Sequence, residues 1–187
     1  MLRRLLDSFP ATPAFILNPA LDLLAVNALA DSLFSPFERA DNLARMTFLD
    51  PVGRHFFARW EEAAESVAAG LRRAIGIDPR DRRAVELADT LVAADADFAD
   101  LWNSHIVRGK TFATKDLRHP DVGALTLAYH CFDVRGASGQ ELVVYHAEPG
   151  SPSVAALSLL GALGATRRQA APSPEKFRPD NSGVTER

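Results

Sequence analysis

Residues 123–149 read GALTLAYHCFDVRGASGQELVVYHAEP, and this stretch predicts a long antiparallel hairpin. Apolar and aromatic residues alternate along its first half, and residues 142–145 are rich in β-branched and aromatic residues, both typical of strands. Residues 136–139, GASG, supply the turn between the two strands. Because apolar side chains fall on both faces of the hairpin, each face needs a cover. The rest of the chain therefore has to pack on this hairpin.

The other segments predict three more strands and several helices, which together give an α+β fold. Residues 14–17 and 22–27 form a first strand pair, and the polar residues 112–119 form another strand, so we expect an antiparallel sheet of about five strands. Helical spacing and capping residues predict helices over residues 2–6, from Asn27 as N-cap to Phe34, over residues 41–49, from Asp50-Pro51 to Ala74, after Asp78-Pro79, after Asp95 and after Ser151-Pro152.

The composition is that of an ordinary globular domain. The chain has 187 residues, of which 47% are hydrophobic and 24% are charged, and this length favours one compact domain. No apolar run approaches the ~20 residues that cross a bilayer, and no secretory signal is evident, so we expect a cytoplasmic protein without membrane association. The net charge of -3 lacks the basic footprint of a nucleic-acid-binding protein.

No motif for a reactive or metal-bearing centre is evident. The chain contains no nucleophile elbow, Gly-rich phosphate loop, HExxH or CxxC. Cys131 has no second cysteine to pair with, and its place in a strand predicts a packed, unreactive thiol. One hairpin register brings His130 and His146 together near Glu148, whereas the neighbouring register separates them, and a third ligand is not evident. We therefore expect neither a metal nor a cofactor.

Five segments of the chain resemble one known family. They read LLDSFPATPAFILNPALDLLAVNALA, DNLARMTFLDP, DFADLWNSHIV, LRHPDVGALTL and ELVVYHAEPGSPS. Together they are similar to the ligand-binding domain of MmyB-like transcriptional regulators, from Leu2 to about Leu160. The resemblance implies a PAS-like fold, in which helices pack over one face of the sheet with a cavity between them. It also implies a fatty-acid-like ligand.

The family's architecture implies an XRE-type helix-turn-helix domain before the ligand-binding domain. No such domain precedes Leu2 in this sequence, so we expect DNA contact only through a helix-turn-helix domain absent from this chain. The chain is then either the sensory part of a longer regulator or a single-domain relative. We assign residues 1–165 to the PAS-like sensor domain and residues 166–187 to a disordered tail, because the tail is polar and rich in proline.

The resemblance also places candidate ligand contacts. Arg45, next to Met46, is the cation expected to bind an acidic head group, and the alternative is a structural ion pair with Asp41 or Asp50. His105 is a second candidate donor, unless it is a capping or core residue. The residues expected to line the cavity, if they do not simply fill a core, are Phe56, Trp60, Trp102, Leu125, Leu127 and Tyr129, with the Tyr129 hydroxyl as a polar anchor.

These observations favour a non-enzymatic sensor that binds a small apolar ligand. Apolar residues on both hairpin faces and in residues 151–163 predict a homodimer. One alternative is a small cone-shaped α+β enzyme, which needs a cavity-facing histidine and carboxylate for acid-base chemistry. The other is a dimerisation module without a cavity.

Overall fold

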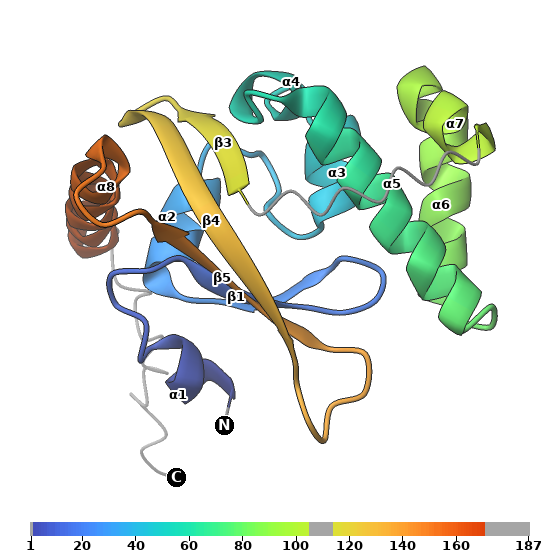
Figure 1. Ribbon diagram of the computed structural model, residues 1–187, viewed down its shortest axis with the longest axis horizontal. Helices are drawn as coiled ribbons and strands as arrows, with labels where there is room; N and C mark the ends of the chain where they lie inside the picture. The colour runs from blue at the N-terminus through green and yellow to red at the C-terminus, as the bar shows by residue number, and fades with distance from the viewer. Residues whose placement is uncertain (1, 105–113, 171–187) are drawn as a thin grey trace, which may run out of the picture.

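The computed structural model describes residues 2–104 and 114–170, in which the chain forms eight helices and five strands (Figure 1). The α+β class predicted from the sequence is confirmed. The elements in chain order are α1 (Leu2–Leu6), β1 (Ala14–Leu17), β2 (Leu23–Val26), α2 (Ala28–Phe34), α3 (Leu43–Phe48), α4 (Gly53–Phe56), α5 (Trp60–Ile77), α6 (Arg82–Ala94), α7 (Ala96–Asn103), β3 (Thr114–His119), β4 (Gly123–Asp133), β5 (Glu141–Ala147) and α8 (Pro152–Ala170).

The strands form one antiparallel sheet in the order β2-β1-β5-β4-β3. β4 and β5 are the predicted long hairpin, with Tyr129 directly opposite Tyr145. Gly136 and Gly139 in its turn have φ angles of 86° and 77°, in the left-handed region that glycine adopts without a steric penalty. β1 pairs with both β2 and β5, so the N-terminal hairpin joins the central one as predicted.

Asn27 fixes the N-terminal segment against the sheet and begins α2. Its side-chain oxygen accepts the N–H of Ala30 at 2.8 Å, which is the predicted N-cap, and the N–H of Ala14 at 3.2 Å. Its amide nitrogen donates to the carbonyls of Phe9 and Thr12, both at 2.8 Å. Because Asn27 is only 5% exposed, these bonds replace the water that its amide loses on folding.

The prediction of one continuous helix from Asp50-Pro51 to Ala74 is wrong. The chain forms two helices, α4 and α5, and leaves helical geometry at Phe57, where φ is -83° and ψ is 106°. Phe57 forms a β-bridge with Leu117, and the N–H of Ala58 donates to the carbonyl of Asp116 at 2.9 Å. These bonds to β3 exist only in the folded chain, so tertiary contacts interrupt a helix that local spacing would continue.

Two helix ends also differ from those predicted. α6 begins after Asp81, whose side chain accepts the N–H groups of Arg83 and Ala84, rather than after Asp78, whose side chain closes the preceding turn. α8 continues to Ala170, beyond the boundary expected at residue 165. The remainder of the expected tail, residues 171–187, lies outside the described residues.

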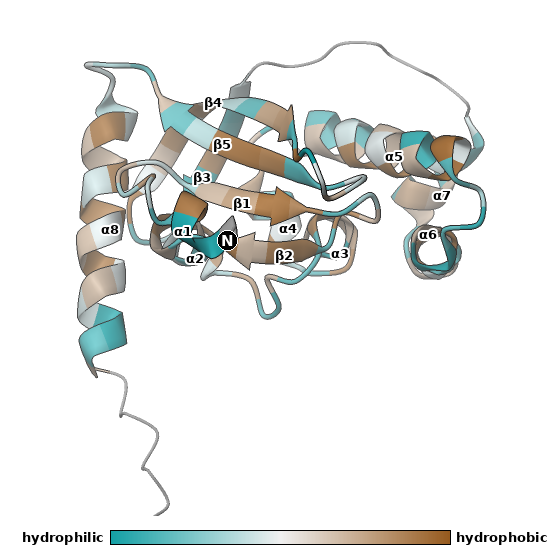
Figure 2. Cartoon of the chain, turned by 90° about the horizontal axis from the view of Figure 1, so that it is seen from below, coloured by the Kyte–Doolittle hydropathy of each residue, from teal (hydrophilic) through white to brown (hydrophobic). Residues whose placement is uncertain are grey.

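The helices cover the two faces of the sheet unequally. The inner face carries Phe15, Leu125 and Tyr145, and it packs against α2, α4 and α8 in the main core. On the outer face, Leu6 of α1 packs against strand residues from β1 and β5. Figures 1 and 2 show α8 at one end of the sheet and the group α5–α7 at the other, while Figure 2 shows apolar residues concentrated in β1 and β5. No helix within residues 2–104 and 114–170 is long and apolar enough to cross a membrane.

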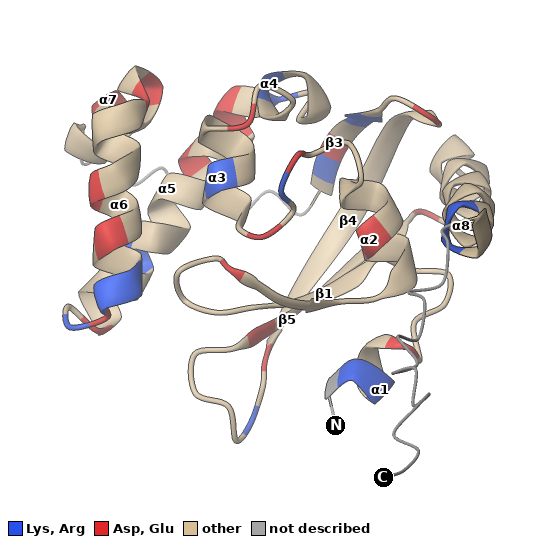
Figure 3. Ribbon diagram, turned by 180° about the vertical axis from the view of Figure 1, so that it is seen from behind, with Lys and Arg blue, Asp and Glu red and all other residues tan. Residues whose placement is uncertain are grey.

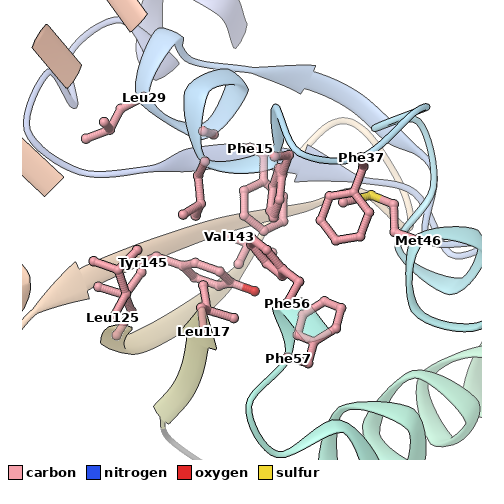
Figure 4. Packing of buried hydrophobic residues seen from close by; sticks show 14 of the residues in the cluster. Phe15, Leu29, Phe37, Met46, Phe56, Phe57, Leu117, Leu125, Val143 and Tyr145 are labelled. Atoms are coloured by element: carbon pink, nitrogen blue, oxygen red, sulfur yellow. The ribbon is translucent and has the colours of Figure 1, made fainter. Parts of the chain in front are cut away.

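Two buried clusters hold the helices in place. The main core gathers aromatic rings under α2 and α4, among them Phe34. Figure 4 shows two others, Phe37 and Phe56. A second cluster lies among α3, α5, α6 and α7 and includes the fully buried Phe98. α5 therefore contributes residues both to the main core against the sheet and to the second cluster among the helices.

Candidate functional site

A cavity of about 170 Å³ lies between α5 and the inner face of the sheet. Its polar lining includes Lys115, Tyr129 and Tyr145 on the sheet and Arg73 in the C-terminal part of α5. Its apolar walls come from β1 and β5, from α2, α3 and α5, from the turn after β1 and from the residue that follows α4: Phe15, Leu17, Leu21, Phe34, Leu43, Phe57, Ala63, Val67 and Val143. Carbon walls with a few polar groups are typical of small-molecule sites.

The space exists because the side chains of α5 that line it are small. Ala63, Ser66, Val67 and Gly70 line the cavity at helical spacings of three and four. A Cβ added at Gly70 would have one neighbour within 4 Å, a Leu21 methyl at 3.8 Å, which is an ordinary contact. Glycine destabilises a helix interior by about 1 kcal/mol relative to alanine. α5 therefore has no side chain at Gly70, although helix stability alone favours a larger residue there.

A second depression, of about 430 Å³, adjoins the cavity. The two spaces share Leu21, Gly70, Arg73 and Glu141 in their walls. Arg73 of α5 donates to Glu141 of β5 at 3.1 Å, so an ion pair links helix and sheet at the boundary. The Arg73 side chain is 64% exposed, and exposed pairs contribute at most about 1 kcal/mol. This ion pair can therefore open at little cost in free energy.

Three polar side chains reach the cavity from neighbouring strands, and we call them the polar wall: Lys115 of β3, Tyr129 of β4 and Tyr145 of β5. Tyr129 is paired with Tyr145, and Lys115 is paired with Leu127, two residues along β4 from Tyr129. The Lys115 Nζ lies 5.2 Å from the Tyr129 ring centroid, and the two tyrosine centroids are 6.1 Å apart. The register thus gathers one amine and two hydroxyls in one region.

Burial changes the titration of all three groups. Loss of hydration lowers the pKa of the Lys115 amine and raises the pKa of the Tyr129 and Tyr145 hydroxyls, because burial disfavours each charged form. The tyrosines are therefore neutral donors at neutral pH. Figure 4 shows the Tyr145 hydroxyl directed toward Phe56 and Phe57.

Cys131 lines the same cavity, and its predicted packing is wrong: the residue is exposed. The helices do not fully cover this part of the inner face, because β4 extends toward the hairpin turn beyond them (Figure 1). Burial of its sulfur is still sufficient to raise the pKa of the thiol, with a smaller contribution from Glu141. A raised pKa disfavours the thiolate, which is the nucleophilic form.

Of the predicted cavity residues, Tyr129 lines the cavity. Met46, Phe56, Leu125 and Leu127 are at most 1% exposed in the main core, which adjoins the cavity along the sheet. Their predicted contact with a ligand stays a prediction. They contact other core side chains, which is the core-filling alternative considered for the aromatic and aliphatic residues.

Trp60 and Trp102 pack against the cluster around α5–α7. The Trp60 indole N–H donates to the Thr47 carbonyl at 3.0 Å, and Trp102 stacks on Phe98 with ring centroids 5.4 Å apart. His105 lies outside the described residues. The two tryptophans thus hold α5 to its neighbouring helices.

Arg45 lies on the α3 surface, with 39% of its side chain exposed. Its Nε lies 4.0 Å from a carboxylate oxygen of Asp41, the structural partner considered as its alternative. The lining of the cavity near α3 comes instead from Leu43 and Thr47. A role for Arg45 in binding an acidic head group stays a prediction.

Lys115 was missed as a site residue although the sequence carries a signal for it. Leu117 is the main apolar residue inside residues 112–119, which favours an inward orientation. Side chains two residues apart in a strand share a face, so Lys115 had to share the inner face. Gly70 is a second missed residue, because a single glycine in a helical pattern does not indicate what lies opposite it. The cavity therefore follows from small residues on one element and polar residues on another.

The two hairpin histidines meet on the outer face. The rings of His130 and His146 stack with centroids 5.0 Å apart and an interplanar angle of 4°. Within the described part of the chain, no group of three or more His, Cys, Asp or Glu residues has the arrangement of a metal site. In the view from behind, Figure 3 shows basic residues at the start of α6 with acidic residues farther along it, and a basic residue on α3.

The chain matches the model of one protein family. A family model, described as the MmyB-like transcription regulator ligand binding domain, matches residues 1–160. A search of curated proteins found no match to the chain. Every residue that lines the cavity lies within the matched range.

Proposed function

Since the chain belongs to the family of MmyB-like transcription regulator ligand-binding domains, we propose that its cavity binds a single acyl chain, as in a fatty-acid-like ligand. The observation that carries this proposal is the carbon-walled space between α5 and the sheet. Each methylene buried there contributes about 0.8 kcal/mol before the loss of ligand freedom is counted. Chain length should therefore dominate the affinity.

The cavity's size fits a flexible, narrow ligand. Its volume of about 170 Å³ is smaller than the ~300–1,000 Å³ of typical small-molecule pockets. A longer chain extends into the adjoining depression when the Arg73–Glu141 pair opens. The PAS-like assignment is part of this proposal, supported by helices packed on one sheet face with a cavity beneath them.

The regulatory output runs through α5. Because α5 packs on α6 and α7 in the second cluster, a ligand that displaces α5 also displaces this helical group. A bias of ~1–3 kcal/mol is enough to change the activity of an attached or associated DNA-binding domain of the helix-turn-helix type. We place homodimer formation on the exposed apolar side chains of α8, Val154 and Leu159, which are 45% and 51% exposed.

The enzyme alternative is less well supported. It requires a histidine and a carboxylate facing the cavity, and the described lining contains Glu141, engaged by Arg73, but no histidine. The dimerisation module requires that the cavity be absent, which the space under α5 disfavours.

A matched pair of substitutions on α5 tests the proposal. Gly70→Leu fills the cavity, whereas Gly76→Leu adds the same side chain where a Cβ has no neighbour within 4 Å. We expect dodecanoic, tetradecanoic and hexadecanoic acids to raise the melting temperature increasingly in the wild type and in Gly76→Leu. Gly70→Leu should abolish the response.

Native mass spectrometry of the purified chain provides the direct readout of a bound acyl chain. The absence of any stabilisation by all three acids, with no bound ligand detected, would refute the proposal. The same series on Arg45→Ala, with the matching alcohols as controls, tests the predicted role of that arginine, because a response reduced for the acids but not for the alcohols would assign the head group to it.

A further inference from the structure

We propose that Lys115, assisted by the hydroxyls of Tyr129 and Tyr145, binds the anionic head group of the ligand. The ligand is then a single-chain anionic amphiphile with its head at β3 and its tail directed along α5 toward Arg73. This inference rests on the proposed function, and it adds the head-group chemistry, the orientation of the ligand and the residue that determines both.

Lys115 is a partly buried cation that forms no ion pair within 4 Å in the part of the chain that the structure describes. Among the residues that the structure describes, its amine has a cation–π contact with Tyr129 but no ion pair or hydrogen bond. The nearby carboxylates are already engaged, because Arg59 lies 3.1 Å from Glu62 and 2.8 Å from Asp116. The charge of Glu62 favours the protonated amine from a distance, but burial outweighs it and lowers the pKa of Lys115. A partly desolvated amine without a counter-ion in contact is unfavourable. An anion entering the cavity would remove this penalty.

The tyrosine hydroxyls supply matching donors. Tyr145 is 6% exposed, and within residues 2–104 and 114–170 its hydroxyl makes no hydrogen bond. Tyr145 lines the cavity, and its hydroxyl is not one of the fully buried polar atoms that lack a partner, so a ligand in the cavity can accept a hydrogen bond from it. A carboxylate offers about four lone-pair sites, enough to accept from the amine and both hydroxyls, and bonds to a charged acceptor are stronger than neutral ones.

The other cations near the cavity already have carboxylate partners. Arg73, at the far end, donates to Glu141, and Arg45 lies closest to Asp41. The Lys115 end is bounded by Ala63 of α5, and a helix rises 1.5 Å per residue, so Ala63 and Arg73 lie about 15 Å apart along the axis. This length suits an extended tail between the head-group site and the opening at Arg73.

Three dodecyl compounds that differ only in the head group test the inference, together with one charge-removing variant. Binding of dodecanoic acid, dodecyl phosphate and 1-dodecanol is measured by calorimetry at neutral pH, below micelle formation. We expect the wild type to prefer at least one of the two anions over the alcohol by about tenfold. The preferred anion distinguishes a carboxylate from a phosphate head group.

Lys115→Met should reduce this preference to about twofold or less and leave the affinity for 1-dodecanol unchanged. Lys115→Arg should retain most of the preference, since it keeps the charge. Arg45→Ala should retain all of it. Tyr145→Phe should lower it partially, because one donor is lost. Circular dichroism confirms that each variant is folded.

The two proposals fail in different ways. Equal affinity for the anions and the alcohol in the wild type, or a tenfold preference that persists in Lys115→Met, would overturn the head-group assignment while acyl-chain binding stands. If none of the three compounds binds the wild type, the proposed function and this inference both fall.

Discussion

The inner face of the sheet is filled under α4 and hollow under α5, although the two helices are separated by three residues. Under α4, Phe56 is 1% exposed and its ring centroid lies 4.8 Å from that of Phe37 and 5.2 Å from that of Phe57. Under α5, the corresponding layer consists of small residues such as Ala63 and Gly70. The volume of the side chains on the covering helix therefore decides which region is core and which is cavity.

This contrast predicts that the region under α4 contributes mainly to stability and the region under α5 mainly to ligand binding. Interlocked aromatic rings gain dispersion and burial energy, and any lost volume leaves a cavity. The region under α5 lacks this packing energy, because its side chains border a cavity. Substitutions there should therefore change the free energy of unfolding little and ligand binding strongly.

The largest effect is expected from truncating the packed region. Phe56→Ala should lower the free energy of unfolding by about 3–5 kcal/mol, because the surrounding rings cannot collapse into the space. Val67→Ala, at the cavity wall, should lower it by less than about 1.5 kcal/mol, since its side chain already borders empty space. Urea denaturation measures both. Equal losses would mean that the region under α5 is packed as tightly as the rest.

An intermediate effect is expected from acidification, through His119 in the packed region. Its Nε2 lies 3.2 Å from the Ser32 carbonyl, which only accepts, and its Nδ1 accepts the N–H of Asp121 at 3.2 Å. Both bonds are made by the neutral ring, and burial lowers the pKa of His119 below its ordinary value of 6.5. The unfolded chain then binds a proton that the folded chain does not.

The stability that His119 contributes is therefore fully present above about pH 6.5 and is lost as the pH falls through the lowered pKa, by at most about 1.4 kcal/mol per pH unit. Urea midpoints measured between neutral and mildly acidic pH should decline more steeply in the wild type than in His119→Gln, which cannot titrate. Parallel declines would show that His119 does not carry this linkage.

The smallest effect is expected from Lys115 in the hollow region. Lys115→Met removes an amine whose pKa is lowered by burial, so it should leave stability unchanged or raise it by up to about 1 kcal/mol without ligand. Arg118→Met, on the exposed side of the same strand, is the matched control and should change stability by less than ~0.5 kcal/mol. A clear loss of stability in Lys115→Met alone would assign the lysine a structural role.

The sequence alone determined those helix ends and turns that are specified by residues close together in the chain. Alternation and the GASG turn predicted the β4–β5 hairpin, and Asn27 and Asp95 were correctly predicted as helix caps. Each of these features depends on backbone groups within a few residues of the signal, so it is readable without the fold. The resemblance to the family likewise rests on five segments of the sequence and on the order in which they follow one another.

Tertiary structure decided the features that depend on contacts between distant segments. The break at Phe57 needs the backbone of β3, and the exposure of Cys131 depends on where the covering helices stop. The cavity needs the small residues of α5 placed over the polar wall of the sheet, a juxtaposition set by strand order and helix packing. Whether a side chain fills a core or borders a cavity depends on the volume opposite it, and that volume is fixed only when the chain has folded.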